Sequence, residues 1–401
     1  MSSATIHASD RTASATDLGG RDYRLDFFRG LALFFIFIDH IPNNPFAYAT
    51  LRTFSLADAA EVFIFISGYT AALVYGRKMQ RDGALYATAL IWRRAWQLYV
   101  AHLCLFMLYS AQVAYTLQKF NNPLFSDELG IGDFLSHPDE TLVRVLLLEF
   151  QPAYLDILPL YIFLLLIFPI FMLLMRRHTL AALLPSLALY LFAHATSLNM
   201  PGNTDSDGWY FNPFAWQFLF VIGACLGFGQ AGGRRLPRTG WLVRSVLVAA
   251  VLVAAASLTV QVSWTLHEWN PRIPGILFQA FWPIDKSMLS PLRILSIVAL
   301  AVLVGWLIPR DAVFMTSRPG WIVVLCGQNS LHVFCLSILL SMMGNILLTF
   351  VSRTWWVLLG VNIGGILIMC GLGLLTAWYG AGGHLPRRPA GKVRAPAEGA
   401  K

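Results

Sequence analysis

Charged residues are scarce in this chain of 401 residues: Asp, Glu, Lys and Arg make up 12% of it, about half the share of a soluble domain. The five cysteines all lie inside apolar runs, and the chain has neither a CxxC pair nor a Cys/His pattern with metal-ligand spacing. We therefore expect free, buried thiols and no metal site. Hydrophobic residues reach 57%, and this balance excludes an ordinary soluble domain and predicts a polytopic membrane protein.

Ten apolar runs are long enough to cross a bilayer as helices. An all-α bundle of about ten transmembrane helices is therefore expected, with both termini on one side of the membrane. Most of the 29 Lys and Arg residues fall in segments on the side of the N-terminus, which predicts that both termini are cytoplasmic. Short clusters between spans account for the net charge of +8, so no nucleic-acid partner is expected. The runs cover about residues 25–42, 57–76, 90–115, 153–175, 179–198, 212–229, 242–265, 288–308, 320–349 and 356–379.

The two ends of the chain differ from this apolar body. Residues 1–20 are rich in Ser, Thr, Ala and Asp and have no apolar core, so we expect a disordered cytoplasmic N-terminus and not a cleavable signal peptide. Residues 381–401 form a basic, Pro/Gly-rich segment that we expect to be a disordered cytoplasmic tail. One membrane domain, 21–380, is predicted between them.

The first span carries four ionisable residues, Asp26, Arg29, Asp39 and His40. A charge near the centre of a bilayer costs about 3 kcal/mol on insertion scales. At about 100° per residue, Arg29 and His40 lie within about 20° of each other around the helix, and Asp26 lies about 40° to the other side of His40. These three residues share one stripe, on which Arg29 and His40 are roughly 16 Å apart. Such a stripe must face protein or a water-filled cavity and not lipid.

His40 is a candidate general base, because neutral imidazole accepts protons near neutral pH. Asp58 and Glu61 begin the second span at the same outer level, so either of them, or Asp39, could orient the imidazole. The alternative is a histidine at a helix end, with Asp58 and Glu61 serving as helix-start caps.

Arg93 and Arg94 begin the third span on the cytoplasmic side, followed by Gln97. Two adjacent arginines could clamp a phosphate group bidentately. A positive-inside flank with an aromatic belt explains them as well, and without other information this simpler reading is favoured.

Two further groups of polar residues are less specific. Gln328, Asn329 and His332 lie within the ninth span and could line a cavity or form hydrogen bonds between helices. Outer loops rich in Trp and carboxylates suit sugar binding, although interface anchoring explains the Trp residues equally well. The loop residues are Asp205, Asp207, Trp209, Tyr210, Trp264, Glu268, Trp269, Trp282 and Asp285.

Three segments, RLDFFRGLALFFIFIDH, AEVFIFISGYTAALVYGR and WRRAWQLY, make the chain resemble the membrane acyltransferase-3 superfamily and, within it, the OpgC family. The resemblance is densest over about residues 22–100, and GQNSLHVFCL resembles a late segment of the family. Members typically O-succinylate osmoregulated periplasmic glucans. Many relatives carry a fused SGNH-type domain, which this chain lacks, so the membrane domain would perform the whole transfer or work with a separate protein.

The resemblance implies roles for matching residues. The first-span motif falls on Asp26, Arg29 and His40, with His40 as the catalytic base, and the second-span motif on Glu61, Ser67 and Gly68. Arg93 and Arg94 would handle acyl-CoA, expected as co-substrate in the form of succinyl-CoA, with no permanently bound cofactor. Arg293, Lys286 and Arg52 are weak candidates for binding the free carboxylate of a succinyl group.

The expected protein is a multi-pass acyltransferase of a bacterial inner membrane. Its acceptor would be a periplasmic glucan, and its neighbours would be the lipid bilayer and glucan-synthesis proteins. Two alternatives are a transporter of a glycan or anionic solute without acyl transfer, which the lack of an internal repeat disfavours, and a scaffold for glucan synthesis.

Overall fold

The computed structural model describes residues 21–120, 129–202, 208–232, 239–272, 275–281, 284–310, 312–386 and 388. The expected disordered segments, 1–20 and nearly all of the tail after 386, lie outside the described residues, as do Asp205, Asp207 and Trp282. Every regular element in the described part is helical, so the all-α prediction is confirmed there.

The longer helices follow the apolar runs of the sequence. They are α1 (Tyr23–Asp39), α2 (Ala59–Asp82), α3 (Ala84–Phe120), α7 (Ile157–Arg177), α8 (Thr179–Thr196), α9 (Pro213–Ala231), α10 (Trp241–Trp269), α12 (Pro291–Leu307), α14 (Arg318–Gln328), α15 (Ser330–Phe350) and α16 (Trp355–Gly380). Short helices connect them: η2 (Pro45–Ala49), η3 (Leu51–Thr53), α5 (Gly132–Ser136), α6 (Pro138–Leu146), α11 (Ile276–Phe281) and α13 (Val313–Thr316).

Within the described residues, eight helices are long and apolar enough to cross a membrane: α2, α3, α7, α8, α9, α10, α15 and α16. The first and eighth expected spans are α1 and α12, which have 17 residues each. Each of the ten expected runs is therefore helical, and the chain has the architecture of an all-α, multi-pass membrane protein. The third run is longer than expected, because α3 has 37 residues and starts at Ala84. Arg93 and Arg94 consequently lie inside this helix and do not begin it.

The ninth run differs from the expected single helix. It is divided at Asn329, whose backbone (φ −104°, ψ 32°) leaves the helical region between α14 and α15. The Asn329 amide group donates to the carbonyl of Leu325 at 2.9 Å, and Gln328 donates to Asp26 on α1 at 3.3 Å. Gln328 and Asn329 therefore lie at a helix break, and their side chains form hydrogen bonds there.

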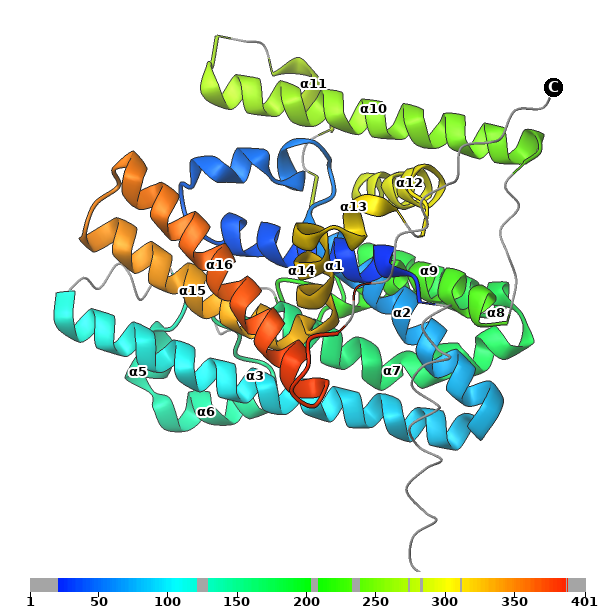
Figure 1. Cartoon of the computed structure of the whole chain (residues 1–401), viewed down its shortest axis with the longest axis horizontal. Helices are drawn as coiled ribbons and strands as arrows, with labels where there is room; N and C mark the ends of the chain where they lie inside the picture. Colours follow the sequence, from blue (N-terminus) through cyan, green and yellow to red (C-terminus); the bar gives the residue numbers. More distant parts are fainter. Residues whose placement is uncertain are drawn as a thin grey trace, which may run out of the picture.

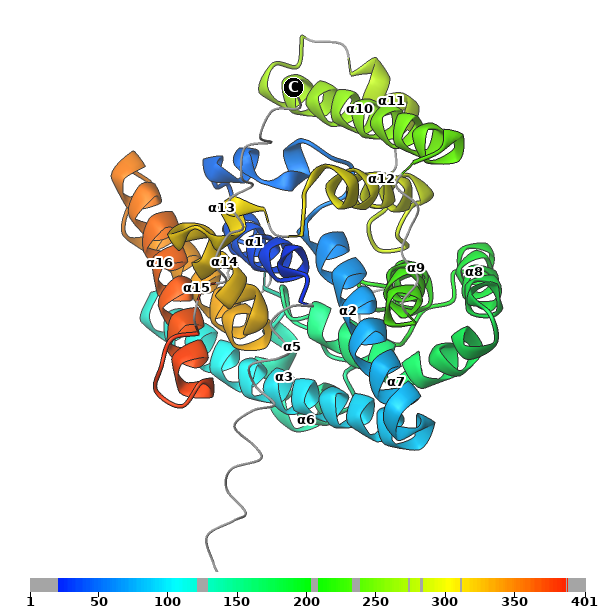
Figure 2. The same ribbon diagram turned by 45° about the vertical axis from the view of Figure 1, so that its right-hand side comes forward.

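Close helix packing places α1 and α2 inside the bundle. Gly30 on α1 and Gly327 on α14 lie where α1 contacts α14, and a Cβ atom on either residue would collide with the backbone of the other helix. Gly68 on α2 and Gly223 on α9 allow the same close approach between α2 and α9. In both ribbon views α1 is surrounded by other helices, whereas α10 lies at the edge with α12 between it and the body (Figure 1, Figure 2).

Candidate functional site

A cavity of about 1200 Å³ opens where the C-terminal end of α1 meets the N-terminal ends of α2 and α7. Loop residues preceding α7, α9 and α12 complete its wall. The lining is polar and rich in carboxylates and aromatic rings. It includes Asp39, His40, Arg52, Asp58, Glu149, Gln151, Tyr154, Asp156, Asn199, Trp209, Tyr210, Phe211, Asp285, Lys286 and Ser287.

His40 is the residue that ends α1 at this cavity. Its backbone N–H donates to the carbonyl of Ile36, which fixes the last turn of the helix. Its side-chain Nδ1 is buried and has no hydrogen-bond partner among the described residues. The imidazole packs against the ring of Tyr154, with 4.6 Å between the ring centroids and 38° between the planes. Nε2 is therefore the ring nitrogen with which His40 can meet a ligand in the cavity.

Tyr154 holds an unusual backbone conformation. Its φ is +73°, in the left-handed region that a bulky side chain adopts only at a cost of about 1–3 kcal/mol. The segment before α7 turns sharply there and carries the Tyr154 ring to the imidazole. No sequence signal pointed to Tyr154, because its contact with His40 joins segments more than a hundred positions apart.

The carboxylates expected to orient His40 have other partners in the structure. Asp39 accepts a hydrogen bond from the hydroxyl of Thr50 at 2.8 Å. One oxygen of Glu61 accepts from the backbone N–H of Asp58 at 2.8 Å, and its other oxygen accepts from Arg293 at 2.6 Å. No hydrogen bond from His40 to a carboxylate is present in the described part of the chain, so the arrangement differs from a carboxylate-oriented triad.

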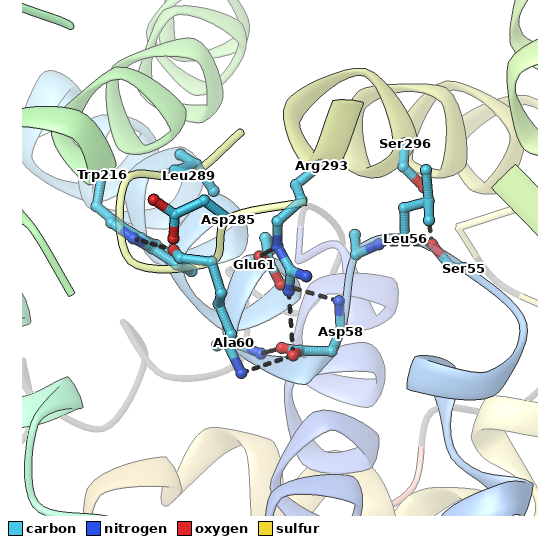
Figure 3. A network of polar contacts seen from close by, with 12 residues as sticks. Ser55, Leu56, Asp58, Ala60, Glu61, Trp216, Asp285, Leu289, Arg293 and Ser296 are labelled. Carbon is cyan, nitrogen blue, oxygen red and sulfur yellow. Dashed lines mark hydrogen bonds and ion pairs between the residues drawn. The ribbon is translucent and has the colours of Figure 1, made fainter. Parts of the chain in front are cut away.

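Asp58 and Glu61 instead form the acidic side of a buried ion network. They make a capping box at the start of α2, which is the helix-cap alternative that the sequence left open. Figure 3 shows Arg293, from the first turn of α12, pointing toward both carboxylates. Its Nη2 lies 3.2 Å from Asp58 Oδ2, and Lys286 Nζ lies 2.6 Å from the same oxygen. The Glu61 side chain is 0% exposed.

The charges of this network shift the pKa values of Lys286 and Asp58, which lie just outside the helices. Burial alone would lower the pKa of Lys286, but Asp58 and Glu61 outweigh it and raise this pKa. Burial would raise the pKa of Asp58, whereas Lys286 and Arg293 hold it well below its usual range. Lys286 and Asp58 are thus a charged pair at neutral pH. Lys286 also lowers the pKa of Asp156, but burial outweighs this effect and raises that pKa to about 6.

Further along α1, the polar stripe faces protein, as its spacing predicts. Arg29 donates to the hydroxyl of Thr70 at 2.6 Å and to the carbonyl of Ile66 at 3.3 Å, both on α2. Asp26 is buried and accepts from Arg21 at 2.7 Å as well as from Gln328. The stripe is therefore held between α2 and α14.

The other predicted site residues do not line the large cavity. Arg93 is exposed on α3, and Arg94 donates to Gln97 at 3.2 Å. Ser67 is buried within α2. Gln328, Asn329, His332 and Arg293 do not line the cavity either, although Arg293 contacts the lining residue Asp58. Of the thirteen predicted site residues, the structure brings His40, Asp39 and Asp58 together there.

Comparison with known proteins decides the family. A family profile described as "OpgC protein" matches residues 21–381, which is nearly the whole chain. The chain belongs to this family. No curated protein and no solved structure matches it. The chain is therefore an OpgC-type, glucan-modifying membrane protein with multiple membrane spans.

Proposed function

We propose that this OpgC-family protein is an O-acyltransferase of a bacterial inner membrane. It would move an acyl group, in the simplest case succinyl, from cytoplasmic acyl-CoA to a hydroxyl of a periplasmic glucan. The observation that carries the proposal is the position of His40. A histidine with one buried ring nitrogen and one available ring nitrogen borders a polar cavity large enough for an oligosaccharide segment and a thioester.

The lining of the cavity supports a carbohydrate as the acceptor. Trp209, Tyr210 and Phe211 offer aromatic surface, and Gln151 and Asn199 offer amide groups. Sugars present both apolar faces and hydroxyl groups, so such a mixture suits them. The several carboxylates would accept hydrogen bonds from hydroxyls and would repel the phosphates of CoA. The nucleotide end of the donor therefore belongs elsewhere.

In the proposed reaction, Nε2 of His40 accepts the proton of a sugar hydroxyl while the hydroxyl oxygen attacks the thioester carbonyl. The new C–O bond forms as the C–S bond breaks, and the imidazolium returns the proton to the leaving thiolate. The products are a sugar ester and CoA. Tyr154 would keep the imidazole in place, because Asp39, Asp58 and Glu61 are engaged with other groups.

The donor would approach along the stripe of α1 from the predicted cytoplasmic end. Arg94 lies close enough to Arg29 for their charges to interact across the helices. With Arg93, these residues supply the positive charge that a CoA phosphate group requires. The 16 Å or so between Arg29 and His40 along the helix, at about 1.5 Å per residue, would then be spanned by the pantetheine arm.

A succinyl group also carries a free carboxylate, for which three cations were candidates. Arg293 is bonded to Glu61 and does not line the cavity. Lys286 and Arg52 do line it, and Lys286 is already paired with Asp58. Arg52 is exposed and therefore better placed to receive an anionic acyl end.

The test uses purified protein in vesicles, with acyl-CoA on the side of the termini and neutral glucan on the other side. We expect ester formation with the wild-type chain and loss of at least about a hundredfold in His40→Ala, the lower end of typical general-base effects. His384→Ala, an exposed histidine after α16, is the matched control. Wild-type ester yield in His40→Ala would refute the role of His40. Movement of solute without CoA consumption would favour a transporter.

A further inference from the structure

A second, smaller cavity of about 260 Å³ lies beside the large one. It occupies the space between the C-terminal half of α10, the short helix η3 and the start of α12. Arg52 and Asp58 line both cavities, so the two are neighbours through these side chains. The other lining residues are Tyr48, Thr53, Ser55, Leu56, Gln261, Trp264, Thr265, Glu268, Ile284 and Arg293.

The wall formed by α10 is held in place by specific contacts. The hydroxyl of Ser257 on α10 lies 2.8 Å from that of Ser296 on α12, and it accepts a hydrogen bond from the backbone N–H of Leu56 at 2.8 Å. At the end of α10, the ring of Trp269 packs edge-on against Tyr48 at 5.2 Å. The second cavity is therefore a built feature between packed elements, although α10 lies at the edge of the molecule (Figure 1).

The chemistry of the lining suits an uncharged ligand with many hydroxyl groups. Two cations, Arg52 and Arg293, and two carboxylates, Asp58 and Glu268, line the cavity, so the formal charges of its lining balance. Such a balance gives no advantage to the phosphates of a nucleotide or a lipid headgroup. The volume of the second cavity is below the range of about 300–1000 Å³ that holds drug-sized ligands, so this cavity fits a single sugar ring better than an oligosaccharide.

Aromatic and amide groups complete this pattern. Trp264 and Tyr48 provide ring surface, while Gln261 and Thr53 can both donate and accept hydrogen bonds. We infer that the second cavity is an accessory sugar subsite. It would bind one ring of the same glucan chain whose acceptor hydroxyl lies at His40 in the large cavity. The link to catalysis rests on the proposed function, whereas sugar binding by this cavity does not.

A binding measurement without acyl donor tests the subsite. Neutral glucan oligosaccharides, from disaccharide to hexasaccharide, are titrated against the full-length protein in detergent, and binding is followed by calorimetry and saturation-transfer NMR. We expect affinity to rise with length in the wild-type chain. Trp264→Ala should weaken binding of the longer oligosaccharides about tenfold and leave that of the disaccharide nearly unchanged. Trp264→Phe, which keeps an aromatic ring, should recover part of the loss.

The matched control is Trp306→Ala, because Trp306 is exposed on α12 and lines neither cavity. Gln261→Ala gives a second, milder probe if Trp264→Ala fails to fold. Equal length dependence in wild type, Trp264→Ala and Gln261→Ala would overturn the subsite, even if acyl transfer is detected. If the wild-type protein shows no acyl transfer but Trp264→Ala still removes the dependence of affinity on oligosaccharide length, the subsite is supported and the proposed reaction is overturned.

Discussion

Removal of the Arg293 charge should destabilise the protein strongly. Arg293 Nε lies 2.6 Å from Glu61 Oε1, and its Nη2 lies 3.2 Å from Asp58 Oδ2. The Glu61 side chain is fully buried, so water cannot replace the guanidinium in Arg293→Met. Lys286 makes its ion pair with Asp58 and none with Glu61 within the described residues, so it does not substitute for Arg293.

The magnitude follows from leaving a carboxylate buried without its partner. Such changes cost about 3–5 kcal/mol, whereas replacement of both partners by neutral groups is often nearly neutral. We therefore expect about 3–5 kcal/mol for Arg293→Met. Adding Glu61→Gln to Arg293→Met should restore much of this loss, because the amide keeps an acceptor for the backbone N–H of Asp58 and carries no charge.

The free energy of unfolding can be measured for the two single variants and the double variant by titrating SDS into mixed micelles. The coupling energy of the cycle should exceed about 1 kcal/mol. Arg81→Met is the control, since Arg81 pairs with Asp82 at the surface, and its stability should stay near that of the wild type. Additive effects of Arg293→Met and Glu61→Gln would show that the network does not act as a buried ion pair.

Three further predictions concern the site, the helix contacts and the donor. Tyr154→Gly and Tyr154→Ala should both lower ester formation at least about tenfold. The free energy of unfolding should nevertheless be about 1 kcal/mol higher for Tyr154→Gly than for Tyr154→Ala, because glycine adopts positive φ without strain. Equal stability of the two variants would argue against strain at this position. Gly30→Ala should reduce the yield of folded protein, measured by size-exclusion chromatography, because the added Cβ meets the backbone of α14, whereas Gly229→Ala enters open space and should behave like wild type. Arg94→Ala should raise the KM for acyl-CoA about tenfold with little change in kcat, as expected for loss of a charged contact to phosphate; Arg176→Ala, on the exposed end of α7, is its control, and a fall in folded protein alone would indicate a topological role.

The helices could be predicted from the sequence because each depends on local properties. A run of about twenty apolar residues must satisfy its backbone internally, so helical spans follow from length alone. The polar stripe of α1 was predictable for the same reason, since angular spacing within one helix is fixed by its geometry. The break at Asn329 was not predicted, because the polar residues of this run were interpreted as cavity lining or as interhelical hydrogen bonds within one continuous helix.

The contacts between helices could not be predicted in this way. Arg293 and Glu61 are 232 positions apart, and periodicity within either helix says nothing about which helix faces it. His40 and Tyr154 meet because a loop residue takes a positive φ, which no pattern in the sequence required. The sequence therefore predicted that carboxylates at the start of α2 would orient His40, whereas the structure pairs these carboxylates with Arg293 and Lys286.

The buried ions have a consequence for the cavity that a purely structural role would not require. An apolar replacement of a buried ion pair is often as stable as the pair or more so. Stability alone therefore does not explain a network of four charges, two at the start of α2 and two at and before the start of α12. The same four residues fix the start of α12 and the loop that carries Lys286 against the wall beside His40. The network thus orients a cation and a carboxylate into the cavity while it withdraws Glu61 from the histidine. His40 makes no hydrogen bond to a carboxylate within the described residues, and its imidazole packs against the ring of Tyr154 at the cavity wall.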